Sequence, residues 1–159
     1  MIVLNSVKSD IALTLYYARN SRYGLNVLIG ALEKHGLDSH VSIYLIEPTV
    51  DNVLENLVGL ANRHKEVVMA FSILTPTLPT ILNLIREMVR LRDKLNLTLI
   101  AGGPHVTGDP IGMLKLGFNY VFIGESEETF VKFLSELVNK GDVKRVPGIA
   151  YLEMGKPVF

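Results

Sequence analysis

The sequence predicts an α/β domain in which a doubly wound parallel sheet is covered by helices on both sides. Two observations support this fold class. Five short apolar segments alternate with helical patterns along the chain, and these segments are continuously apolar instead of alternating with polar residues. Continuous apolar runs are typical of strands buried on both faces, as in a parallel sheet. A chain of 159 residues is long enough for one such domain with a full core.

The first half of the chain contains three of the predicted strands: residues 11–17, 41–46 and 67–71. Residues 1–4 are either the start of the first strand or a separate edge piece. Residues 25–35 carry apolar side chains at helical spacing, and Gly36 is expected to end that helix. Thr49 or Asp51 can cap the next helix, which precedes the third strand.

The second half continues the alternation. A long helix over residues 78–94 leads to a strand at 97–101, and a short helix at 111–116 leads to a strand at 120–123. A last helix begins at residues 127–129. Short connections and right-handed crossovers then predict a flavodoxin-like three-layer sandwich with strand order 2-1-3-4-5.

Residues 146–159 depart from this pattern. They predict two short strands joined by a turn near residues 153–156, so the domain ends in a hairpin-like tail. The chain stops on an apolar residue, Phe159, within the second of these strands. We therefore expect residues 1–145 to form the domain and residues 146–159 to start a connection to a further C-terminal domain.

The composition excludes several classes of partner. The 16 basic and 16 acidic residues leave no net charge with which to bind nucleic acid or anionic lipid. The chain has no cysteine, so it can form neither a disulfide nor a cysteine-held metal or iron–sulfur site. No apolar run reaches the roughly 18 residues of a membrane span, and the start does not resemble a signal peptide. We expect a cytoplasmic protein.

Glycines follow two neighbouring strands at the point where each strand ends. Gly102 and Gly103 follow the strand at 97–101, and Gly124 follows the strand at 120–123. Ligands of open α/β sheets lie beyond the carboxyl ends of the strands, and glycine lets the main chain come close to a ligand. These residues are expected to share one rim with Ser72, Thr75 and the loop at 19–24.

Several familiar ligand classes of this sheet do not fit the rim. A phosphate-accepting receiver domain needs an aspartate after the third strand, where this chain has Ser72. A flavodoxin needs a hydroxyl-rich phosphate loop after the first strand, and residues 19–24 hold one serine and two arginines. A dinucleotide fingerprint needs several glycines in that loop, which has only Gly24, and a P-loop lysine motif is absent.

Four stretches instead resemble the cobalamin-binding domain of cobalamin-dependent radical S-adenosylmethionine proteins. They are Phe-Ser-Ile-Leu-Thr-Pro at 71–76, Ala-Gly-Gly-Pro-His at 101–105, Phe-Ile-Gly-Glu-Ser-Glu-Glu-Thr at 122–129 and Val-Pro-Gly-Ile-Ala-Tyr at 146–151. Each motif is short, but their order and spacing together are specific. The resemblance covers residues 11–159.

The resemblance implies contacts with the nucleotide tail of cobalamin. Ser72 and Thr75, on either side of Leu74, would hydrogen-bond the tail and its dimethylbenzimidazole. The other implied contacts of the tail are with Gly102, Gly103, Gly124 and Glu125. His105 is either a contact of the tail or corrin or a solvated loop residue. Arg19 and Arg22 either meet the edge of the corrin or are simply exposed, and Tyr23 is expected with them near the lower face of the corrin.

The chain departs from the wider cobalamin family at one place. Many of these domains carry Asp-x-His-x-x-Gly after the first strand, and counting back from Gly24 puts Arg19 and Ser21 at the aspartate and histidine positions. The resemblance therefore implies that cobalamin is bound base-off, with its dimethylbenzimidazole removed from the cobalt, and that no histidine takes the place of this base. Cobalt bound in this way would carry methyl groups. The S-adenosylmethionine and the [4Fe-4S] cluster would belong to the further domain, which would make the full protein a methyltransferase.

A second hypothesis needs no cofactor. The same residues fit a doubly wound regulatory or protein-interaction domain, in which Gly102 and Gly103 form a tight turn and Ser72 and Thr75 cap the next helix. In neither reading is this chain alone an enzyme. His35, His40 and His64 lack ligand spacing, and the sequence predicts no metal site. A visible spectrum recorded with hydroxocobalamin would distinguish the two hypotheses.

Overall fold

The computed structural model describes residues 1–5, 7–48 and 50–159, without the side chains of Val50 and Asp51. The expected cap of the second helix, Thr49 or Asp51, therefore lies outside the described residues. The strands are β1 (Ile2–Val3), β2 (Ile11–Tyr16), β3 (Ser42–Ile46), β4 (Glu66–Ser72), β5 (Leu97–Gly102), β6 (Tyr120–Phe122), β7 (Ile149–Glu153) and β8 (Lys156–Val158). The α-helices are α1 (Arg22–Lys34), α2 (Val50–Ala61), α3 (Leu78–Leu95), α4 (Pro104–Gly108), α5 (Pro110–Leu116) and α6 (Glu127–Val138).

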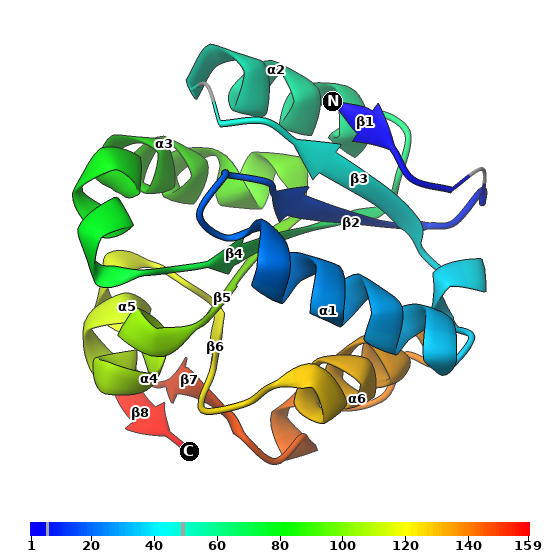
Figure 1. The fold of residues 1–159 in the computed structure, drawn as a ribbon. Coiled ribbons are helices and arrows are strands. Elements are labelled where there is room, and N and C mark those ends of the chain that lie inside the picture. The colour runs from blue at the N-terminus through cyan, green and yellow to red at the C-terminus, as the bar shows by residue number, and fades with distance from the viewer. Residues whose placement is uncertain (6, 49) are drawn as a thin grey trace.

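The part of the chain that the structure describes forms one sheet of eight strands in the order β1-β3-β2-β4-β5-β6-β7-β8. The central strands β3, β2, β4, β5 and β6 are parallel, which confirms the predicted order 2-1-3-4-5. Residues 1–4 provide the separate edge piece: β1 pairs antiparallel with β3. The predicted tail hairpin, β7 and β8, is also present, and it extends the same sheet antiparallel to β6 (Figure 1).

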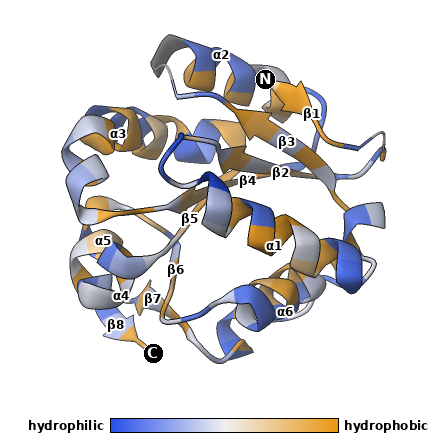
Figure 2. Ribbon diagram, in the orientation of Figure 1, coloured by the Kyte–Doolittle hydropathy of each residue, from blue (hydrophilic) through white to orange (hydrophobic). Residues whose placement is uncertain are grey.

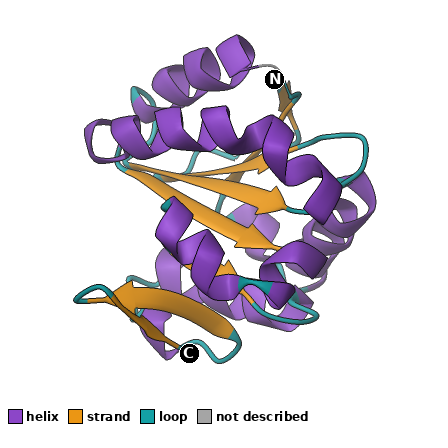
Figure 3. Cartoon of the chain, turned by 90° about the vertical axis from the view of Figure 1, so that its left-hand side faces the viewer, coloured by secondary structure: helices purple, strands orange, loops and turns teal. Residues whose placement is uncertain are grey.

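Helices cover both faces of the sheet (Figure 3). The apolar sides of α1 and α6 pack on one face with Leu13, Leu15 and Phe122, while α2, α3 and α5 pack on the other with Met69 and Phe71. Figure 2 shows the resulting pattern, with hydrophobic strands between helices whose outer sides are hydrophilic. Because every central strand is covered on both sides, the sequence shows continuous apolar runs instead of alternation.

The ends of the helices follow local sequence signals. Gly36 adopts a left-handed φ of 71° just after α1, as expected for a helix stop. Two acidic residues, Glu127 and Glu128, occupy the first turn of α6, where carboxylates favour the positive end of the helix dipole. The sequence did not predict α4, a single short helix between β5 and α5. Pro104 starts it, and proline is tolerated at a first helical position because its missing N–H has no partner there.

Candidate functional site

The carboxyl ends of the central strands bring the predicted rim residues to one edge of the sheet. Ser72, at the end of β4, is paired in register with Gly102, at the end of β5. The first turn of α1 lies on the other side of Ser72: a Cβ placed on Gly24 would be 3.5 Å from the Ser72 Oγ. Adjacent parallel strands force this arrangement, because their carboxyl ends meet at the same edge. Ser72 therefore stands at the centre of the rim.

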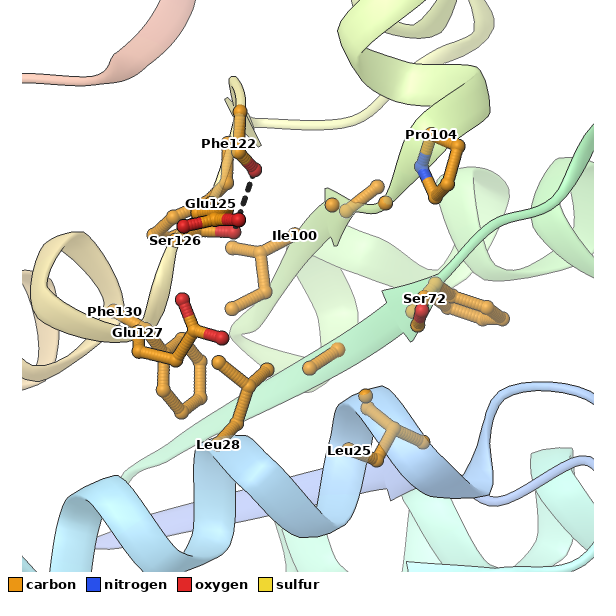
Figure 4. Close-up of a pocket in the computed structure, with 17 residues that line it drawn as sticks. Leu25, Leu28, Ser72, Ile100, Pro104, Phe122, Glu125, Ser126, Glu127 and Phe130 are labelled. Carbon is orange, nitrogen blue, oxygen red and sulfur yellow. Dashed lines mark hydrogen bonds between the residues drawn. The ribbon is translucent and has the colours of Figure 1, made fainter.

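A pocket of about 180 Å³ opens at this edge, between α1, α6 and the ends of β4, β5 and β6. Figure 4 shows its lining, in which apolar side chains from α1, β5 and α6 converge. The lining residues are Gly24, Leu25, Leu28, Ala70, Phe71, Ser72, Ile100, Ala101, Gly102, Gly103, Pro104, Phe122, Gly124, Glu125, Ser126, Glu127 and Phe130. Five of the predicted site residues line it, together with the motif glycine Gly24: Ser72, Gly102, Gly103, Gly124 and Glu125. We call this cavity the tail pocket.

The inner wall of the tail pocket is apolar. Its buried members are Leu25, Ala70, Ile100, Phe122 and Phe130, all of which are at most 3% exposed. Leu28 adds a half-buried side chain from α1. An apolar helix face such as that of Leu25, Leu28 and Phe130 gives the same sequence pattern whether it meets a core or a pocket. Only the tertiary packing shows that part of this face is left uncovered.

Polar side chains lie at the ends of the tail pocket. The loop from β6 to α6 supplies Glu125, Ser126 and Glu127, and the Ser126 hydroxyl donates to the Gly124 carbonyl at 3.4 Å (Figure 4). At the other end, the Ser72 hydroxyl has no hydrogen-bond partner among the described residues. A free hydroxyl beside an apolar wall is suited to a flat ligand that carries one polar atom.

The glycines of the rim differ in whether the surrounding structure would leave room for a side chain. A Cβ on Gly102 would make ordinary contacts, 3.5 Å from the Phe122 Cβ and 3.6 Å from the Ser126 Oγ, so the fold itself does not demand glycine there. Gly103 has a φ of 104°, and its Cβ would meet the main chain of Ile73. Gly124 also has a positive φ, 77°, but open space around it. The fold itself therefore requires glycine at 103, and the role of Gly103 in ligand approach stays a prediction.

A second pocket, of about 300 Å³, lies on the other side of Ser72. It contains three further predicted residues, Arg19, Ser21 and Leu74, and is lined by Tyr16, Ala18, Arg19, Asn20, Ser21, Pro48, Ser72, Leu74, Thr77, Thr80 and Ile81. The expected single crevice is thus divided in two, with Ser72 common to both. Burial raises the pKa of the Tyr16 phenol in this pocket, so that group stays protonated at neutral pH.

Ser21 occupies the position at which many cobalamin domains carry a histidine. It is only 6% exposed, and its hydroxyl is directed to the main-chain carbonyls of Ala18, at 3.1 Å, and Tyr16, at 3.3 Å. These contacts hold the start of α1 against the end of β2. The Ser21 hydroxyl is therefore engaged in the loop itself.

The last three predicted residues line neither pocket. The Thr75 Oγ1 and the His105 Nδ1 are 3.0 Å apart and partner each other across the loops after β4 and β5. The other ring nitrogen of His105, Nε2, is buried without a partner among the described residues. Tyr23, in the first turn of α1, is 84% exposed. These three remain predictions for contacts with a ligand that extends beyond the pockets.

The other polar chemistry of the chain is structural. The His64 ring lies between the Tyr44 hydroxyl, at 2.9 Å, and the Ser9 carbonyl, at 2.8 Å, near the opposite ends of the strands. Within residues 1–5, 7–48 and 50–159, no three His, Asp or Glu side chains gather as they would around a metal ion. None of the described helices is long and apolar enough to cross a membrane.

The site as a whole can hold a ligand. What the site offers is a narrow apolar slot, which lies beside the free Ser72 hydroxyl and opens between two loops. Such a slot accepts one flat ring system, since a cavity of roughly 150 Å³ lined by similar side chains binds benzene. The larger part of any ligand would lie outside, over the rim.

Comparison with known protein families identifies one match. Residues 11–134 fit the family model described as B12 binding domain. No curated protein sequence matches the chain.

Solved structures share the fold. TsrM from Kitasatospora setae, a radical S-adenosylmethionine methyltransferase solved with cobalamin and a [4Fe-4S] cluster, is 17% identical with a TM-score of 0.71. OxsB, a cobalamin-dependent S-adenosylmethionine radical enzyme solved with aqua-cobalamin, is 17% identical with a TM-score of 0.64. The matches cover 94% and 96% of this chain, but only 28% of TsrM and 22% of OxsB. This chain thus corresponds to less than a third of either protein.

Proposed function

The chain belongs to the B12-binding domain family, and from this premise we propose that it binds cobalamin base-off and without a histidine on cobalt, as the N-terminal module of a radical S-adenosylmethionine methyltransferase. The tail pocket would hold the dimethylbenzimidazole nucleotide, and the corrin would lie over the rim. When bound, the cobalt supplies a centre that can carry a methyl group. The chain's own residues would bind and orient the cofactor and keep water from its tail.

The observation that carries this proposal is the tail pocket between Gly24 and Gly102. Side chains at these two positions would project toward the slot, since the contacts of their Cβ atoms would be with Ser72, Phe122 and Ser126, which all line it. Glycine keeps the slot open without being required by the main chain at either place. The free Ser72 hydroxyl can donate to the single unsubstituted ring nitrogen of dimethylbenzimidazole. The residues present therefore fit the group.

The absence of a histidine on cobalt is supported by the loop after β2. Ser21 stands where the ligand would be, and its hydroxyl is occupied by main-chain carbonyls. The nearest histidine along the chain is His35, which caps the far end of α1, 13 residues of helix later. No side chain of this loop is a strong nitrogen donor at neutral pH, since Arg19 and Arg22 are cationic.

The link to a radical S-adenosylmethionine domain is supported by the shared fold. This chain matches about a quarter of TsrM and OxsB, both named for S-adenosylmethionine radical chemistry, and it resembles the cobalamin module that such proteins carry. We place the S-adenosylmethionine and the [4Fe-4S] cluster in the following domain. Methyl transfer would then belong to the complete protein, and this chain would position the cofactor for it.

Titration of the 159-residue chain with hydroxocobalamin, followed by visible absorption, tests the proposal. We expect a saturable spectral change at one cobalamin per chain, and the cofactor should remain with the protein through gel filtration. A chain that is folded by circular dichroism and yet gives no saturable change would overturn cobalamin binding. That result would favour the cofactor-free regulatory or interaction domain instead.

A further inference from the structure

The polar and apolar groups of the tail pocket are separated. Its polar side chains come from the two ends, with Ser72 on one side and Glu125, Ser126 and Glu127 on the other (Figure 4). The wall between them is made by Leu25, Leu28, Ala70, Ile100, Phe122 and Phe130. A ring system that enters the slot therefore meets aliphatic and aromatic carbon along its length, the free Ser72 hydroxyl at one end, and the carboxylates of Glu125 and Glu127 at the other.

Resting on the proposed function, we infer that this wall selects among cobamides by the base of their nucleotide tail, accepting benzimidazoles and rejecting purines. Cobamides share the corrin and differ in this base. Dimethylbenzimidazole carries one unsubstituted ring nitrogen and two methyl groups. Adenine carries an amino group and three unsubstituted ring nitrogens around its edge. Only the first base matches a slot in which one free hydroxyl, that of Ser72, can donate to a ring nitrogen.

The physical basis of the selection is the cost of burying polar atoms without partners. The ring nitrogens of adenine would exchange their water for Ile100, Phe122 and Phe130, which offer no hydrogen bond. The carboxylates of Glu125 and Glu127 can accept from the amino group, but they cannot donate to a ring nitrogen. Water cannot fill the gap, since a cavity of about 180 Å³ that holds a bicyclic base leaves little room for a solvent molecule with its own partners. The methyl groups of dimethylbenzimidazole gain from the same contacts.

Leu28 is the residue best placed to test this selectivity. It lies in the second turn of α1, it is half-buried, and its side chain is directed into the pocket (Figure 4). Glutamine is a good helix former of similar length, so Leu28→Gln keeps α1 while adding one donor and one acceptor to the wall. An amide of this kind can pair with the amino group and a neighbouring ring nitrogen of adenine.

The experiment measures dissociation constants of the 159-residue chain for three ligands: cobalamin, the cobamide with adenine as its base, and cobinamide, which has no nucleotide tail. We expect the adenine cobamide to bind about 10- to 100-fold more weakly than cobalamin. Cobinamide should also bind more weakly than cobalamin, because it leaves the pocket empty. Leu28→Gln should lower the preference for cobalamin over the adenine cobamide by about tenfold.

Leu152→Gln is the matched control, since Leu152 lies on β7, is 38% exposed and does not line the pocket. It should leave the preference unchanged. Each cobamide must release its base from cobalt before it binds, and the free energy of this step depends on the ligand alone. It therefore cancels when the ratio of the two dissociation constants for a variant is divided by the same ratio for the native chain.

Equal affinity of the native chain for cobalamin and the adenine cobamide would overturn the inference, and so would cobinamide binding as tightly as cobalamin. Either result would leave cobalamin binding itself intact. An unchanged preference in folded Leu28→Gln would also contradict it. If no corrinoid binds, the proposed function fails and the inference with it. If Leu28→Gln does not fold, the dissociation constants of the native chain for the three ligands still decide whether the pocket selects among cobamides.

Discussion

Gly103 lies against the main chain of Ile73: a Cβ on Gly103 would be 2.9 Å from the Ile73 carbonyl oxygen and 3.0 Å from its nitrogen. The loops after β4 and β5 are joined at this point, since the Ile73 N–H donates to the Gly102 carbonyl at 2.9 Å and the His105 N–H to the Ile73 carbonyl at 3.2 Å. These contacts hold the two loops against each other beneath the candidate site. The contact with Ile73 also distinguishes Gly103 from its neighbour Gly102, although the two glycines look equivalent in the sequence.

Gly103→Ala should destabilise the fold whether or not a ligand is present. Its positive φ and its contact with Ile73 predict a loss of about 1–3 kcal/mol in the free energy of unfolding. Gly102→Ala is the matched control, because its Cβ makes only ordinary contacts, and it should stay within about 0.5 kcal/mol of the native chain. Urea unfolding measures both. Equal stability of the two variants would show that the Ile73 contact does not constrain the loop.

Gly24→Leu should abolish cobalamin binding and preserve the fold. Its side chain would start 3.5 Å from the Ser72 Oγ and extend into the tail pocket, while leucine is a better helix former than glycine. Gly30→Leu on the same helix is the control, because Gly30 is exposed and its Cβ would have no neighbour within 4 Å. Absorption titration compares the two variants. Cobalamin binding by Gly24→Leu with native affinity would mean that the tail does not enter this pocket.

Ser72→Ala should weaken cobalamin binding by about two- to tenfold, the worth of one hydrogen bond, without changing stability. Its hydroxyl has no partner among the described residues, so the fold loses nothing. Thr77→Ala should give the opposite pattern, since the Thr77 Oγ1 donates to the Leu74 carbonyl at 2.8 Å and accepts from the Leu74 N–H at 3.3 Å. A stability loss in Ser72→Ala with unchanged affinity would make Ser72 a structural residue.

The electron paramagnetic resonance spectrum of the bound cob(II)alamin form should lack nitrogen splitting. An axial nitrogen divides each cobalt line into three, and neither the displaced base nor a histidine is expected on the lower face. Free cob(II)alamin, whose base remains on cobalt, is the positive control. A triplet in the complex would contradict the coordination that we propose, and His35→Ala and His105→Ala would then identify the donor.

Glu66 should make the fold less stable as the pH rises from acid to neutral. Burial raises the pKa of this carboxyl above its ordinary value of 4.5, opposed by a hydrogen bond from Thr98. Because the folded state holds the proton more tightly, this contribution is fully present below the unfolded pKa and is lost as the pH rises through the folded pKa. Glu66→Gln should therefore be more stable than the native chain at pH 7 and similar to it near pH 4.

Urea unfolding at several pH values measures this difference. Glu55→Gln, which changes an exposed carboxylate on α2, provides the control and should alter stability little at any pH. A Glu66→Gln variant that is less stable than the native chain at pH 7 would show that its charged form is favoured in the fold.

The fold class, the order of the central strands and the edge on which the site lies all followed from local patterns in the sequence. Buried parallel strands require continuous apolar runs, and their carboxyl ends must meet, so Ser72, Gly102 and Gly124 could be placed together from their positions after strands. The stop at Gly36 and the acidic start of α6 are likewise local, since each depends on a few adjacent residues.

Which of these residues share a pocket depends on packing between elements that are distant in the sequence. In the sequence, Leu28, Ile100 and Phe130 have the pattern of core residues, because a core and the wall of an apolar slot require the same apolar side chains. Gly102 and Gly103 look alike until the main chain of Ile73 is placed beside one of them. Thr75 and His105 partner each other across two loops, a contact set by how β4 and β5 end. Pockets and close approaches arise from elements far apart in sequence, and local patterns carry no information about that spacing.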